Sequence, residues 1–176
     1  MKNIFKVLSI IAMVALIAFS FVSCEDEDPG NDGVQKSLVI TGIPTDTLNT
    51  SATATTDVKG KQLTVALCNQ KGGATGKGKG DFELYAFNQI TIPGTSPGAT
   101  GATIEIALIS ATTKVQFTGT GQYYVLLYFD TSDTPTDLSD DITYSYTAQA
   151  GGTVPLTINI TEDKTTLEFN KFTILQ

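Results

Sequence analysis

The residues of this chain that most resemble a site for chemistry lie in a glycine- and lysine-rich stretch, KGGATGKGKG, at positions 71–80. Gly73, Gly78 and Lys79 have the spacing of a phosphate-binding loop, in which backbone N–H groups and a lysine surround phosphate oxygens. That loop also needs Ser or Thr after the lysine and a helix that begins there. Here Gly80 follows, and then comes the alternation of a strand. We therefore interpret the stretch as a basic loop between two strands.

A second candidate is the aspartate-rich segment DTSDTPTDLSDD, at positions 130–141. Carboxylate oxygens are the ligands that Ca²⁺ prefers, but the regular Asp spacing of an EF-hand is absent. The segment is interpreted most simply as a solvated hairpin loop, with a calcium site as the alternative. The candidate metal ligands are Asp130, Asp133, Asp137, Asp140 and Asp141.

Acids and tyrosines also occur on the predicted strands. A pair of carboxylates with one raised pKa can hydrolyse a glycoside. The strand glutamates, however, occupy the outward positions of alternating patterns, which favours a structural role. Tyrosines offer a flat apolar face and one polar tip, which suits a core position with the hydroxyl at its rim. These residues are Glu83, Glu105, Glu162 and Glu168, and Tyr85, Tyr123, Tyr124, Tyr128, Tyr144 and Tyr146.

Several residue types are missing from the chain. It contains no His and no Trp, and all eleven of its basic residues are lysines. Without His there is no Ser-His-Asp or Cys-His nucleophile and no imidazole metal site, and two cysteines are too few for structural zinc. The formal charge of −7 and the absence of Arg argue against nucleic acid as a partner. The sequence therefore predicts neither a catalytic residue nor a cofactor.

From Gln35 onward, period-2 alternation and turn residues predict β-structure and no helix. The segment 122–129 is apolar on both faces, as in a central strand that is covered on each side. Residues 166–175 shift their apolar phase at Asn170–Lys171, which predicts a β-bulge. In 154–161 the pattern places Val154, Leu156, Ile158 and Ile160 on one face. The predicted strands are 37–40, 61–67, 81–87, 103–109, 114–117, 122–129, 141–147, 154–161 and 166–175.

This pattern of about eight strands predicts an all-β fold. An antiparallel β-sandwich of the Ig-like or Greek-key kind is the first interpretation, and an up-and-down, lipocalin-like barrel is the alternative. A domain of this size buries enough surface to fold without a disulfide or metal. Cys68 is expected to be a small buried residue on a strand.

The N-terminal segment has the composition of an export signal. Lys2 and Lys6 precede residues 7–22, which carry no charge. Sixteen helical residues rise about 24 Å, which is less than the ~30 Å hydrocarbon core of a bilayer. A basic start and a short apolar run are typical of a cleaved signal peptide.

Phe21, Val22 and Ser23 stand before Cys24, and this pattern resembles the lipobox of bacterial lipoproteins, in the looser form similar to that of spirochaetes. The resemblance covers about the first 30 residues. It implies cleavage before Cys24, diacylation of its thiol and, in many members, acylation of the new amine with fatty acids such as palmitate. Several acyl chains hold a protein firmly in a membrane, whereas one holds it only marginally.

The segment after Cys24 is acidic and rich in Pro and Gly, so it predicts a disordered tether. The expected organisation is a signal peptide over 1–23, the lipidated Cys and tether over 24–34, and one β domain over 35–176. We expect an exported lipoprotein, on the periplasmic or surface face of the outer membrane, that binds a protein or glycan through its loops. A lipocalin-like small-molecule carrier is the alternative, and a carboxylate-based hydrolase is the third hypothesis.

Overall fold

The computed structural model describes residues 33–50, 54–93, 101–131, 138–139 and 141–175. By its internal contacts the chain divides into two units, Met1–Asp32 and Gly33–Gln176. The predicted signal peptide, Cys24 and all but the last two residues of the predicted tether therefore lie outside the described residues. Within the described part, no helix is long and apolar enough to cross a membrane.

The described residues of the second unit form mainly β-strands, and the helical ones among them form two short 3₁₀ turns, η1 (Lys79–Asp81) and η2 (Phe169–Lys171). The strands in the described residues are β1 (Ser37–Ile43), β2 (Thr47–Asn49), β3 (Thr55–Asp57), β4 (Gln62–Gln70), β5 (Phe82–Thr91), β6 (Ala102–Ala107), β7 (Ile109–Ser110), β8 (Gly121–Phe129), β9 (Ile142–Tyr146), β10 (Thr157–Ile160), β11 (Lys164–Glu168) and β12 (Phe172–Ile174).

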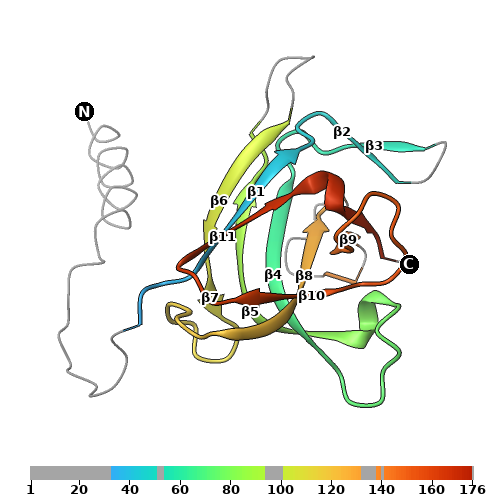
Figure 1. Cartoon of the computed structure of the whole chain (residues 1–176). Helices are drawn as coiled ribbons and strands as arrows, with labels where there is room; N and C mark the ends of the chain where they lie inside the picture. The colour runs from blue at the N-terminus through green and yellow to red at the C-terminus, as the bar shows by residue number, and fades with distance from the viewer. Residues whose placement is uncertain (1–32, 51–53, 94–100, 132–137, 140, 176) are drawn as a thin grey trace, which may run out of the picture. The chain divides into compact units, whose positions relative to one another are not determined.

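These strands form a large sheet of seven strands, a small sheet of three, and the separate hairpin β2–β3. The large sheet has the order β12-β9-β8-β4-β5-β7, and β10 also pairs with β8. In the small sheet, β1 lies between β6 and β11 (Figure 1). β1 is antiparallel to β6 but parallel to β11, which departs from an all-antiparallel pattern. The chain reaches β11 from β10 of the large sheet, and this change of sheet lets β11 run in the same direction as β1.

One hydrophobic core joins the two sheets. Leu38 and Ile40 of β1 belong to the same buried cluster as Val65 of β4 and Leu127 of β8. Alternate residues of each strand point into this cluster because successive side chains of a strand point to opposite faces. The predicted all-β sandwich is confirmed, and the sheets are not closed into the alternative lipocalin-like barrel.

β8 confirms the prediction of a central strand that is covered on both faces. It pairs with β4 along one edge and with β9 and β10 along the other. Leu127 lies in the core between the sheets, whereas Leu126 belongs to a second apolar cluster on the opposite face of the large sheet. Both side chains are completely buried.

The predicted strand at 114–117 was wrong. Lys114 has a left-handed φ of 61° and lies in a turn, and Val115 is 57 % exposed. Only Phe117 of this segment is buried as predicted. The segment forms only an isolated bridge, between Gln116 and Ile109, and Val115 lies directly beside the turn that Lys114 N–H closes on the Ser110 carbonyl oxygen.

The prediction for 154–161 was only partly right. Strand β10 begins at Thr157; before it, Val154 and Leu156 are 61 % and 43 % exposed, whereas Pro155 is buried. Pro has no N–H to donate to a ladder, which agrees with the strand beginning after it. Ile158 and Ile160 do face the core cluster as predicted.

The predicted bulge at Asn170–Lys171 was also wrong. The change of apolar phase is produced by η2, which joins β11 of the small sheet to β12 of the large one. Leu167 and Phe172 therefore reach the same core from different sheets.

Candidate functional site

The glycine- and lysine-rich stretch is the hairpin between β4 and β5, as the simpler interpretation predicted, and no α-helix follows it. The Asp81 carboxylate accepts hydrogen bonds from the Thr75 hydroxyl at 2.7 Å, the Lys77 N–H at 3.0 Å and the Gly78 N–H at 3.2 Å. These donors, the Thr75 hydroxyl first, hold the pKa of Asp81 below its usual range. Backbone N–H groups of the kind that would surround a phosphate are therefore bonded to a carboxylate of the chain itself.

The hairpin is joined to the aspartate-rich segment through Lys79. The Lys79 ammonium donates to the carbonyl oxygen of Ser139, and it lies 3.3 Å from that of Asp141. Lys71 donates to the Gly80 carbonyl oxygen at 2.8 Å. The structure thus brings together two segments that are about sixty residues apart and that each stood out in the sequence.

The candidate calcium ligands are only partly described. Asp133, Asp137 and Asp140 lie outside the described residues. Asp130 and Asp141 are both 5 % exposed, so these two carboxylates are buried and do not belong to a solvated loop. Within the described ranges, no three His, Cys, Asp or Glu side chains gather as metal ligands.

Beneath the two loops lies the second face, which we define as the side of the large sheet that points away from the small sheet. Its buried residues include Cys68 of β4, and this placement of Cys68 on a strand confirms the prediction. Burial raises the pKa of the Cys68 thiol to about 12, against a smaller lowering by a hydrogen bond with Tyr128. The second face comprises Ala66, Cys68, Phe82, Leu126, Tyr128 and Leu175, with Leu84, Phe87, Tyr124 and Leu138 partly buried against them.

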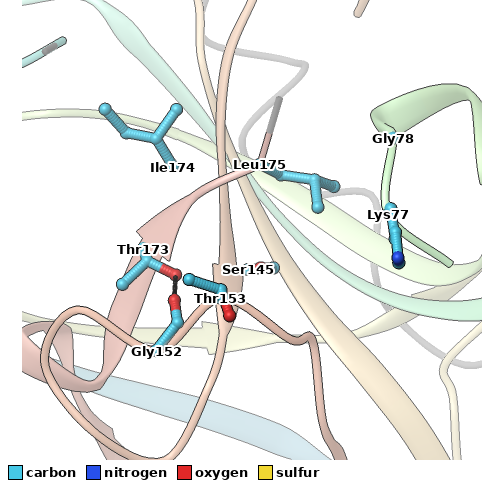
Figure 2. A pocket seen from close by; sticks show the side chains of 8 residues that line it. All are labelled: Lys77, Gly78, Ser145, Gly152, Thr153, Thr173, Ile174 and Leu175. Carbon is cyan, nitrogen blue, oxygen red and sulfur yellow. Dashed lines mark hydrogen bonds between the residues drawn. The ribbon is translucent and has the colours of Figure 1, made fainter.

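One cavity of about 430 Å³ opens between the hairpin and the strands β9 and β12 (Figure 2). Thr173 donates to the Gly152 carbonyl oxygen at 2.6 Å on one wall, and Ser145 lies in the floor with an exposure of only 2 %. Hydroxyl groups, one ammonium and two aliphatic side chains suit a polar ligand with some apolar surface. The lining residues are Lys77, Gly78, Ser145, Gly152, Thr153, Thr173, Ile174 and Leu175.

A second cavity of about 360 Å³ lies on the other side of the hairpin. Its surface is mostly apolar and contains the Phe82 and Tyr128 side chains. Lys77 and Gly78 line the first cavity, whereas Lys79 and Gly80 line this one, so the hairpin contributes to both. The residues that line it are Lys71, Lys79, Gly80, Phe82, Leu84, Tyr128, Leu138 and Ser139.

The strand glutamates lie where the alternation placed them, on the exposed surface. Glu105 forms an ion pair with Lys164 at 2.7 Å, and Glu168 lies 3.9 Å from Lys171. Among the tyrosines, Tyr123, Tyr128 and Tyr144 are buried, as expected of core residues, but Tyr85 is 43 % exposed.

Sequence reasoning did not single out Ser145, Thr153 or Thr173. The alternation in 141–147 placed Ser145 on the face opposite Tyr144 and Tyr146, and such a face normally points to water. In the structure Ser145 lies on β9 between β8 and β12, where it is buried in the wall of a cavity that Lys77 and Gly78 of the hairpin also line. Comparison with protein-family models, with curated proteins and with solved structures finds no match for this chain.

Proposed function

We propose that this chain is an exported lipoprotein whose β domain is a non-catalytic binding module at the cell envelope. The observation that carries the proposal is the second face, on which one hairpin lines two cavities of about 430 and 360 Å³ over a rigid sheet. Loops on a rigid β scaffold commonly carry recognition. The lipocalin-like carrier is not proposed, because it required a closed barrel and the sheets are not closed.

The anchoring half of the proposal rests on the sequence around Cys24. The short apolar segment before it and the acidic segment after it favour export, cleavage and lipid attachment. We expect mass spectrometry of the native protein to find an N-terminal peptide that begins at acylated Cys24, and the Cys24→Ala variant to leave the membrane fraction. An unmodified thiol, or a leader still attached to the mature protein, would refute the anchor.

The binding half is tested by screening glycan and peptide arrays with the mature protein in detergent micelles. A ligand of the second face should bind less tightly to the Lys77→Ala variant, because Lys77 supplies the ammonium of the larger cavity. The matched control is Lys59→Ala, since Lys59 is also exposed but lies beyond β3. Equal affinities of both variants for every ligand found would place recognition elsewhere on the domain.

A further inference from the structure

Several exposed apolar side chains lie on hydrogen-bonded, neighbouring segments close to where the described chain begins. Three side chains make up what we call the entry patch: Val34, 59 % exposed, Tyr85, 43 % exposed, and Val115, 57 % exposed. Hydrogen bonds connect the segments that carry them. Lys36 N–H donates to the Phe117 carbonyl oxygen, Ser110 N–H to that of Val115, and Ala111 N–H to that of Tyr85, each at 2.8–2.9 Å.

Tyr85 of the entry patch packs against two core aromatic rings. The Tyr85 ring stacks on Tyr123, with ring centroids 4.9 Å apart, and meets the edge of Phe117 at 5.7 Å. The Lys114 ammonium lies 5.3 Å from the centre of the Phe87 ring, so a cation stands at the rim of the patch. Aromatic rings with a polar tip and lysines with apolar stems are the side chains that suit a membrane–water interface.

The position of the patch follows the path of the chain. Gly33, the first described residue, packs so closely on Thr118 that a Cβ there would lie 2.7 Å from the Thr118 Cβ. Cys24 stands nine residues before Gly33, and nine residues span at most about 30 Å when fully extended. A lipid on Cys24 would therefore keep Gly33, which directly precedes Val34 of the entry patch, within about that distance of the bilayer surface.

We propose that the entry patch rests on the zwitterionic lipid surface of the leaflet that holds the Cys24 anchor. This inference depends on the proposed anchor and adds to it a fixed orientation of the domain. A patch of three side chains binds a membrane weakly when it is free in solution. Tethering converts the contact into an intramolecular one, at an effective concentration that a short linker brings to the millimolar range.

The charges of the chain favour zwitterionic over anionic lipid. Glu25, Asp26, Glu27 and Asp28 follow the anchor directly, and their carboxylates repel an anionic surface. Lys114 is the one cation that we place on the patch, so the contact is mainly apolar. It should weaken when anionic lipid is added and should depend little on salt.

The absence of Trp from the chain makes a direct test possible, because one introduced Trp is the only Trp emitter. The reporter variant is Val115→Trp and the matched control is Val154→Trp, since Val154 is 61 % exposed but lies between β9 and β10. The mature chain is coupled through Cys24 to maleimide lipid in phosphatidylcholine vesicles that carry a headgroup-level quencher. Cys68 is completely buried and does not compete for the coupling.

We expect the Val115→Trp emission to shift to the blue on coupling and to be quenched several-fold more than that of Val154→Trp. Adding Val34→Glu to the reporter should reduce the quenching. Equal quenching of reporter and control would overturn the inference, as would quenching that grows with anionic lipid. Because the lipid is attached chemically, this result does not depend on whether Cys24 is acylated in the cell, which the mass spectrometry above decides separately.

Discussion

At the scale of single residues, Asp81 decides the chemistry of the hairpin. One of its carboxylate oxygens accepts hydrogen bonds from a hydroxyl and from two backbone N–H groups, which would otherwise be available to an anion. The loop that contains Gly73, Gly78 and Lys79 therefore has the spacing of a phosphate-binding loop, but hydrogen bonds to the Asp81 carboxylate occupy its donors. An anionic ligand would have to displace Asp81, which makes the lysines of this hairpin more suited to neutral polar ligands than to phosphate.

The first prediction concerns Asp81→Asn. The folded-state pKa of Asp81 is lowered, so its contribution to stability is present above the unfolded-state pKa and is lost as pH falls through the folded-state value. We expect the variant to unfold at lower denaturant concentration than the parent at pH 7, and the two to converge in acid. Glu83→Gln, which removes an exposed acid two residues away, is the control and should leave the midpoint unchanged.

The second prediction concerns Cys68. Burial raises the pKa of its thiol to about 12, and the thiolate is the reactive form. In the Cys24→Ala variant, a thiol reagent at pH 8 should therefore label no cysteine in the folded protein and one after unfolding. Labelling of Cys68 under native conditions at a rate close to that of a free thiol would show that the second face is open to solvent.

At the scale of elements, β8 positions the candidate site. Its odd-numbered residues from Tyr123 to Phe129 face the core between the sheets, whereas Leu126 and Tyr128 form part of the second face. The run of apolar residues in 122–129 predicted this arrangement correctly. A strand that is covered on both faces needs apolar side chains on both, so its sequence does not alternate between apolar and polar residues. The strand predictions around Val115 and Val154 were wrong because each rested on a short pattern. Two or three alternating apolar residues do not distinguish a strand from a turn.

The third prediction compares the two faces of β8. Leu126 and Leu127 are both completely buried, so each Leu→Ala change should cost about 2–5 kcal/mol of unfolding free energy. The control is Leu156→Ala, at a position 43 % exposed, which should stay within about 0.5 kcal/mol of the parent. If Leu126→Ala behaves like the control in denaturant titrations, the second face is not a packed cluster in solution.

At the scale of the whole molecule, the two sheets depend on one another. β1 near the start of the domain pairs with β11 near its end, and both contribute side chains to the core that the large sheet also lines. Pairings between segments so distant in sequence make folding slow, in the range of milliseconds to seconds.

The fourth prediction follows from that shared core. Unfolding should be a single cooperative transition, with the same midpoint by far-UV circular dichroism, which reports all strands, and by the emission of the Val115→Trp variant, which reports the entry patch. That variant serves as its own control, because both signals come from one sample. Two separated midpoints would mean that the segment around Val115 unfolds independently of the strands as a whole.

The sequence by itself determined the class of this protein. Period-2 alternation indicated an all-β domain, the apolar run of β8 indicated a central strand, and the residues around Cys24 indicated a lipoprotein leader, which remains a prediction. The two structural inferences succeed because the direction of each side chain in a strand depends on its neighbours in the chain. Only the tertiary structure decided that β11 runs parallel to β1 and that η2 carries the chain between sheets. It also joined the hairpin to the aspartate-rich segment through Lys79. Such contacts join residues tens of positions apart, and no local pattern encodes which distant face a loop will cover.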